Sequence, residues 1–245
     1  MEKLEPEVII SDEKGKEQLA AVGVGLEEKV IGPETLLPTT GTDLSEEQRS
    51  RLEQIQEQWK ETDALYGIFT SGSTGTPKAI VVSHGAVSRF VRHFTEIFEI
   101  TSEDVIGNQA PFDFDVSVKD IYSSIMTGAQ LVLIPKEYFS TPPRLLDYLC
   151  DKKVTNLTWA VSALTLVSAL KGLNYRVPES VKRVMFSGEA MPPKQLRIWQ
   201  EKLPDAKFVN LYGPTEITCN CTYFPIERQY EDSEKIPAGK AFPGR

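Results

Sequence analysis

The sequence predicts an α/β fold, in which helices flank a mixed or parallel sheet and a β-hairpin binds phosphate. Two observations carry this prediction. From about residue 118 onward, short apolar runs alternate with segments of helical periodicity, an order typical of parallel sheets built from right-handed crossovers. Before this region, a loop rich in glycine and hydroxyl groups separates two apolar runs that fit the arms of a hairpin, residues 66–69 and 79–82.

The residues before the hairpin predict short elements. They are a strand at 7–10, a helix at 12–21, a connector at 33–43 and a helix at 45–61. The last of these begins with a capping box, because Ser45 and Gln48 have the required spacing. Its apolar face is narrow (Leu52, Ile55 and Trp59) and the rest of it is charged, so we expect it to lie on a surface.

The residues after the hairpin predict a helix at 84–98 and then the alternating part of the chain. Apolar side chains recur at helical spacing in that helix, which is typical of a hydrophobic core: Val87, Phe90, Val91, Phe94 and Phe98. A second helix, at 118–127, is expected to end at Gly128. The remaining expected elements are strands at 131–134, 155–161, 181–186 and 208–212, and helices at 144–151, 162–171 and 192–202.

The loop between the hairpin arms has the composition of a polyphosphate-binding loop. Its glycines let several backbone N–H groups converge on one anion, its hydroxyls donate short hydrogen bonds, and its lysine adds a full charge. A flexible linker is the alternative, but a linker rarely separates two apolar runs. The Walker pattern is disfavoured, since Pro77 precedes the lysine and a strand follows. The candidate phosphate ligands are Thr70, Ser71, Gly72, Ser73, Thr74, Gly75, Thr76 and Lys78.

Four segments, in order, resemble the motifs of the adenylate-forming ligases, which include acyl-CoA synthetases, luciferases and the adenylation domains of nonribosomal peptide synthetases. Phe69–Lys78 is similar to the family's signature loop, and Phe114–Ser117 to the F-D-x-S segment of amino-acid-activating members. Asn210–Glu216 is similar to N-x-Y-G-P-T-E, and Ile236–Gly244 to the following segment, with Ala241 in place of its usual proline. The resemblance implies part of the family's large N-terminal domain.

The resemblance implies ATP-dependent activation of an amino-acid carboxylate as an acyl-adenylate, with release of pyrophosphate, before transfer to a carrier-protein thiol. This chemistry depends on alignment more than on a strong base, because the carboxylate nucleophile is already ionised near neutral pH. Lys78 is implied to hold the leaving phosphates, Thr215 to lie near the α-phosphate and Glu216 to bind Mg²⁺. The other implied nucleotide contacts, in which Tyr212 presents its ring to adenine, are Gly188, Glu189, Ala190, Asn210, Tyr212 and Gly213.

The resemblance also implies that Asp115 binds the α-ammonium group of the substrate, although a helix N-cap is the alternative for this aspartate. Lys119 leaves two interpretations open. Its cation selects an acidic substrate side chain, or its long stem turns toward solvent and leaves room for a small amino acid such as alanine. The surrounding residues otherwise resemble D-alanine:carrier-protein ligases. The implied side-chain pocket comprises Val116, Lys119, Thr158, Met185, Ser187, Leu211 and Cys219.

The composition argues against several other classes of protein. The net charge is −8 and no cluster of Lys and Arg offsets it, so we expect no nucleic-acid partner. The sequence has neither a signal peptide nor an apolar run of membrane-spanning length. Three cysteines and two histidines make a zinc site improbable, and Cys219 and Cys221 are expected on a strand. We therefore expect a cytoplasmic protein with no membrane partner.

The sequence departs from the family's pattern at both ends. It lacks the Y-x-T-G-D segment that holds the ribose, and the small C-terminal lid domain with its catalytic lysine. We expect a partial adenylation domain over 1–245, with an incomplete N-terminal segment and connector at 1–44, a nucleotide- and substrate-binding core at 45–245, and impaired adenylation by this chain alone. The alternatives are a non-catalytic nucleotide-binding or interaction module and an acyl-CoA synthetase-like ligase for a non-amino acid.

Overall fold

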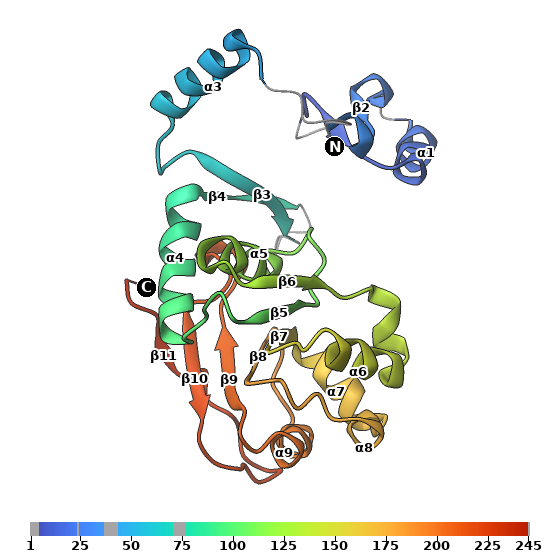
Figure 1. The fold of residues 1–245 in the computed structure, drawn as a ribbon, viewed down its shortest axis with the longest axis vertical. Helices are drawn as coiled ribbons and strands as arrows, with labels where there is room; N and C mark the ends of the chain where they lie inside the picture. The colour runs from blue at the N-terminus through green and yellow to red at the C-terminus, as the bar shows by residue number, and fades with distance from the viewer. Residues whose placement is uncertain (1–4, 24, 37–43, 71–76, 245) are drawn as a thin grey trace. The chain divides into compact units, whose positions relative to one another are not determined.

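The computed structural model describes residues 5–23, 25–36, 44–70 and 77–244 (Figure 1). The chain divides into two units, Met1–Trp59 and Lys60–Arg245. The helix at Glu46–Gln58, which has no buried side chain, groups with the first unit.

The first unit contains short elements beside a two-stranded parallel ladder, in which β1 (Ile9–Ile10) pairs with β2 (Val30–Ile31). The predicted capping box of its last helix is present, since the Ser45 side chain accepts from Gln48 N and the Gln48 side chain accepts from Ser45 N. None of the described residues of this unit is buried. Its other elements are α1 (Glu13–Val22), η1 (Glu27–Lys29), α2 (Pro33–Leu36) and α3 (Glu46–Gln58).

The second unit is built on a mixed sheet with the strand order β11-β10-β9-β8-β7-β5-β6 (Figure 1). The strands from β9 to β6 run parallel, as the alternation of strands and helices predicts, and β10 and β11 extend one edge in antiparallel pairing. The strands are β5 (Val105–Asn108), β6 (Gln130–Leu133), β7 (Asn156–Ala160), β8 (Arg183–Ser187), β9 (Lys207–Tyr212), β10 (Thr222–Ile226) and β11 (Lys240–Ala241).

Helices cover both faces of this sheet and bury one hydrophobic core on each. Because side chains alternate along a strand, Val184 and Phe186 of β8 pack into one core and Met185 into the other. The predicted stripe of the 84–98 helix is buried in the same core as Met185. The helices and turns are α4 (His84–Ile97), α5 (Val116–Thr127), η2 (Lys136–Ser140), α6 (Pro142–Asp151), α7 (Val161–Ala169), α8 (Gly172–Tyr175), α9 (Pro193–Lys202) and η3 (Thr215–Ile217).

The predicted hairpin is present before α4. Strands β3 (Ala64–Thr70) and β4 (Lys78–Ser83) pair antiparallel, and the last pair of the register is Thr70 with Lys78. The Ser83 side chain then accepts a hydrogen bond from Ala86 N and caps α4, so the hairpin leads directly into the helix. The hairpin therefore holds the two ends of the predicted phosphate loop side by side.

Three local expectations differ from the structure. Residues Pro33–Leu36 form a short helix within the expected connector, which fits a proline at the first helical position. Cys219 and Cys221 do not lie on a strand, because Thr218 and Cys219 have positive φ angles and β10 begins at Thr222. A further short helix, α8, follows α7. In the part of the chain that the structure describes, no helix has the length and apolar character needed to cross a membrane.

Candidate functional site

The predicted site residues gather beyond the carboxyl ends of the parallel strands. Ser187 and Tyr212 are the last residues of β8 and β9, and the loop that leads from β5 to α5 contains Asp115. Because parallel strands end at the same edge of a sheet, these three segments meet there, as expected for a doubly wound sheet.

The phosphate hairpin reaches this edge through its second strand. Some Cα atoms of β4 and η3 lie within 8 Å of each other, so the strand that begins at Lys78 runs beside the turn that contains Thr215 and Glu216. Lys78 and Glu216 are exposed, while Thr70 and Thr215 are half-buried. The other predicted loop ligands lie outside the described residues: Ser71, Gly72, Ser73, Thr74, Gly75 and Thr76.

The loop from β9 to β10 is closed tightly on itself. Cys221 N donates to Tyr212 O across 2.8 Å, which brings the two ends of the loop together. Gly213 permits this closure, since a Cβ at this position would lie 2.5 Å from Asn220 Cα. The ring of Tyr212 remains 57% exposed, as a surface for stacking a base requires.

Asp115 is buried at the start of α5, with 8% of its surface exposed. It occupies the N-cap position, but its side chain makes no capping hydrogen bond. Its carbonyl oxygen instead accepts from the Cys219 thiol at 3.0 Å, which connects α5 to the β9–β10 loop. A capping role therefore does not account for this buried carboxylate, and a ligand-binding role remains.

Lys119 lies one turn further along α5 and is 1% exposed. Its Nζ donates to Asn220 Oδ1 at 2.8 Å, so the side chain stays inside the protein. This contradicts the interpretation in which Lys119 turns toward solvent. Burial lowers the pKa of Lys119, while the nearby carboxylates of Asp120 and Asp115 oppose that shift.

Asp120 is the second buried carboxylate of this helix. Its Oδ2 accepts from Asn108 Nδ2 at 3.0 Å. Burial raises the pKa of Asp120 to about 7, against the opposing effects of the Asn108 hydrogen bond and the Lys119 charge. Sequence reasoning missed both Asn108, the last residue of β5, and Asn220 of the β9–β10 loop, because a single asparagine gives no periodic signal.

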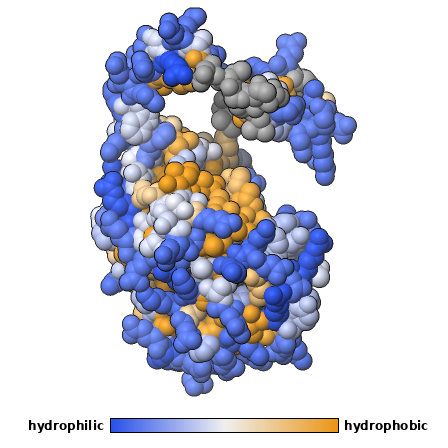
Figure 2. Space-filling view, viewed as in Figure 1, coloured by the Kyte–Doolittle hydropathy of each residue, from blue (hydrophilic) through white to orange (hydrophobic). Residues whose placement is uncertain are grey.

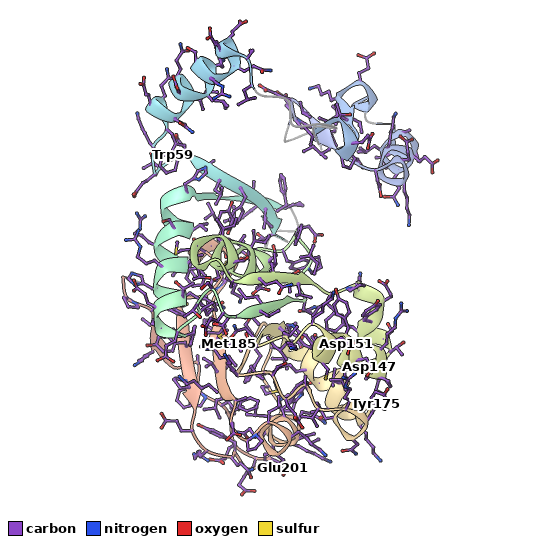
Figure 3. The ribbon with its side chains drawn as sticks, in the orientation of Figure 1. Trp59, Asp147, Asp151, Tyr175, Met185 and Glu201 are labelled. Carbon is purple, nitrogen blue, oxygen red and sulfur yellow. The ribbon has the colours of Figure 1, made fainter. Side chains whose placement is uncertain are left out.

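The predicted pocket residues largely share one face of the sheet. Thr158 of β7 and Met185 of β8, which is labelled in Figure 3, are register partners, and Ser187 follows Met185 on the same face. Met185, Leu211 and Cys219 belong to the hydrophobic core that α4 and α5 cover. Val116 is half-buried at the beginning of α5. Met185, Leu211 and Cys219 thus lie in the core beneath α5, the helix that carries Lys119.

Other implied nucleotide contacts have different surroundings. Gly188 has a φ angle of 97°, so it turns the chain sharply after β8, and Glu189 and Ala190 are exposed beyond it. Asn210 Nδ2 donates to Pro237 O at 2.9 Å and so connects β9 to the segment 236–244. This bond gives Asn210 a structural role in addition to any contact with a ligand.

One group of polar side chains lies away from this edge. Asp147, Tyr175 and Arg176 interact between α6 and α8, where the labelled Asp147 and Tyr175 appear in Figure 3. Among the described residues, no three His, Cys, Asp or Glu side chains cluster as a metal site would require.

Comparison with known proteins gives a family match over the whole chain. The family model of AMP-binding enzymes matches residues 1–245. Tyrocidine synthase 3 of Brevibacillus parabrevis is 39% identical over 178 residues, which are 73% of this chain and 3% of that protein. A D-alanine–D-alanyl carrier protein ligase of Bacillus velezensis is 33% identical over 217 residues, which are 88% of this chain and 41% of the ligase.

Solved structures show the same fold. The Vibrio cholerae adenylation domain AlmE, in complex with glycyl-adenosine-5'-phosphate, has a TM-score of 0.76 and 23% identity, with 96% of this chain and 46% of AlmE covered. The structure of VinN with L-aspartate has a TM-score of 0.75 and 20% identity, with 98% of this chain and 58% of VinN covered. The chain thus spans only part of the relatives that it matches.

Proposed function

The chain belongs to the AMP-binding enzyme family, and from this premise we propose that it takes part in ATP-dependent activation of an amino-acid carboxylate. The observation that supports this most directly is the meeting of three segments at one sheet edge. The hairpin strand β4 lies beside η3, and the residues that follow η3 contact Asp115 through the Cys219 thiol. A nucleotide and an amino acid can therefore be held against each other.

Alignment and charge account for the proposed chemistry. Attack of the substrate carboxylate on the α-phosphate of ATP forms the acyl-adenylate and releases pyrophosphate. Lys78 supplies a cation for the leaving phosphates, and Thr215 supplies a hydroxyl near the α-phosphate. Asp115 fixes the α-ammonium group, so that the carboxylate of the same amino acid points toward phosphorus. The buried position of Asp115 strengthens this charge pair.

The proposed cofactor of the reaction is Mg²⁺, with Glu216 as its protein ligand. Mg²⁺ typically binds one or two carboxylates together with substrate phosphates, and the exposed Glu216 carboxylate fits that arrangement. The ion supplies charge neutralisation for the triphosphate. Glu216 of η3 would hold this ion.

Three further assignments are proposals. The activated amino acid is transferred to a carrier-protein thiol, in keeping with the names of the ligase relatives. The substrate side chain is either acidic or small: a buried cation at Lys119 favours the first, and the likeness to D-alanine ligases favours the second. The compartment that we propose for this chain is the cytoplasm.

Calorimetric titration of the chain tests this function. The ligands are ATP with Mg²⁺, AMP, and the glycyl, alanyl and aspartyl sulfamoyl adenosines, which are stable mimics of aminoacyl-adenylates. We expect at least one mimic to bind more tightly than AMP, because the mimic also engages Asp115. The mimic that binds most tightly identifies the side-chain class.

Asp115→Asn provides the matched variant for this titration. Removing one partner of a buried charge pair costs about 2 kcal/mol or more, so we expect the affinity for the best mimic to fall at least about 30-fold. The affinity for AMP should stay the same. The control is Asp113→Asn, since Asp113 is an exposed neighbour. Equal losses of affinity for the mimic in Asp115→Asn and Asp113→Asn would contradict the proposal. So would a chain that binds AMP but none of the mimics.

A further inference from the structure

The β9–β10 loop is held in a strained conformation. Thr218 and Cys219 have φ angles of 62° and 64°, in the left-handed region that side chains other than glycine rarely adopt. Consecutive residues in such a conformation persist only where neighbouring contacts hold them. Both residues are buried, so the contacts that hold them come from inside the protein.

Two buried contacts hold this loop against the first turn of α5. The Cys219 thiol donates to Asp115 O, and Lys119 Nζ donates to Asn220 Oδ1 at 2.8 Å. Asp115 is the N-cap of α5 and Lys119 lies in its first turn, so both contacts are made at the same end of the helix. Lys119, Cys219 and Asn220 are each at most 2% exposed.

The Lys119 bond is the stronger of the two because its donor carries a charge. A buried ammonium group is unfavourable unless it is paired and hydrogen-bonded, and here Asp115 and Asp120 supply charges while Asn220 supplies an acceptor. An ammonium group held in this way has little freedom to move. It therefore fixes the separation between α5 and the loop.

We infer that Lys119 is a positioning residue that couples the amino-acid side of the site to its nucleotide side. This inference rests on the proposed function. The loop that Lys119 holds begins at η3, with Thr215 and Glu216, and the helix that carries Lys119 begins at Asp115. The bond from Lys119 to Asn220 thus fixes the position of Asp115, which binds the α-ammonium group, relative to Thr215 and Glu216 on the phosphate side. The coupling acts through Asn220 and requires no contact between Lys119 and a ligand.

The test compares affinities for the tightest-binding sulfamoyl adenosine and for AMP by titration calorimetry. In Lys119→Met we expect the affinity for the mimic to fall about tenfold, a typical coupling between sites, while that for AMP is unchanged. Asn220→Leu should produce the same loss. The double variant should lose no more affinity for the mimic than either single variant does, because each of the three variants removes the same interaction. Asn220→Asp retains an oxygen that accepts from Lys119, so it should bind the mimic as the unaltered chain does.

The control is Lys194→Met, which removes an exposed lysine of α9 and should bind both ligands as the unaltered chain does. Circular dichroism establishes that each variant is folded, and if Lys119→Met does not fold, the Asn220 pair tests the inference. Unchanged mimic affinity in Asn220→Leu, additive losses in the double variant, or equal losses for AMP would overturn it. If the unaltered chain binds neither AMP nor any mimic, the proposed function itself fails.

Discussion

At the scale of single residues, Asp120 shows how the interior of α5 responds to pH. It is 2% exposed, accepts a hydrogen bond from Asn108 and lies beside the charge of Lys119. Burial destabilises the ionised carboxylate more than the Asn108 hydrogen bond and the Lys119 charge stabilise it, so the pKa of Asp120 rises to about 7. In the unfolded chain the same carboxyl titrates near 3.9.

This difference predicts a pH-dependent stability. Below about pH 4 Asp120 is protonated in both states and contributes no difference, in accord with its unfolded pKa. Between about pH 4 and pH 7 the folded state binds more protons, so the free energy of unfolding falls as pH rises, and it levels off above pH 7. Urea denaturation between pH 4.5 and 8 measures this slope, which Asp120→Asn should flatten.

The variant Asp120→Asn keeps an oxygen that can accept a hydrogen bond from Asn108, but its side chain no longer titrates. Asp205→Asn, at an exposed position, is the control and should retain the slope of the unaltered chain. An identical slope in Asp120→Asn and the unaltered chain would show that other groups govern stability in this range.

Part of the candidate site could be proposed from the sequence. Asp115, Lys119 and Glu216 could be proposed as site residues because they lie within short motifs whose neighbours are also characteristic. Asn220 could not be placed in this way, because its role depends on a closed loop with two positive φ angles. Likewise, the direction of the Lys119 side chain depends on a partner 101 residues away. Sequence patterns describe a residue's neighbourhood along the chain, and these contacts join distant segments.

At the scale of elements, an ion pair joins the amino ends of the parallel strands. Arg183 of β8 donates to Asp104, which precedes β5, and to Asn156 of β7, each at 3.0 Å. Burial alone would raise the pKa of Asp104, but hydrogen bonds from Thr101 and Thr155 and the charge of Arg183 hold it below its usual range. The pair therefore fixes three strands at the edge opposite the candidate site.

We expect Asp104→Asn to destabilise the second unit by about 3–5 kcal/mol, because it leaves the Arg183 charge buried without its counter-ion. The free energy of unfolding in urea measures this loss. Glu99→Gln is the matched control, since Glu99 pairs with Lys207 at the surface and its loss should change stability little. Similar small effects in both variants would show that Asp104 and Arg183 are weakly coupled.

The elements themselves were predicted to different degrees. The amphipathic helix α4 and the parallel strands β7 to β9 were predicted close to their observed bounds, because apolar periodicity decides such elements. The edge strands β10 and β11 were not predicted, since they are short, polar on one side and interrupted by prolines or glycines. The hairpin arms were predicted from two apolar runs that flank a single loop.

At the scale of the whole molecule, the two units differ in what stabilises them. Both hydrophobic cores lie within Lys60–Arg245, and none of the described residues before Lys60 is buried. The apolar residues of the predicted surface helix, including the labelled Trp59, are 45–54% exposed (Figure 3). On the second unit, Figure 2 shows hydrophobic side chains gathered over α5 and β6, where Ile125 and Leu133 are exposed.

This distribution predicts that the second unit folds without the first. Since burial of apolar surface is the main favourable term in folding, a chain of residues 60–245 should retain the main thermal transition. We expect its melting temperature to differ from that of the full chain by less than about 3 °C, the shift that about 1 kcal/mol produces in a domain of this size. Differential scanning calorimetry of both chains measures the difference.

A second truncation makes this comparison specific. A chain that begins at Arg92 lacks the hairpin and the first half of α4, with the buried Val87, Phe90 and Val91, and should show no cooperative transition, because it leaves a large cavity against the sheet. If the 60–245 chain also lost its transition, residues before Lys60 would have to stabilise the fold. A retained transition together with unchanged binding of the best adenylate mimic would locate both the stability and the site within the second unit.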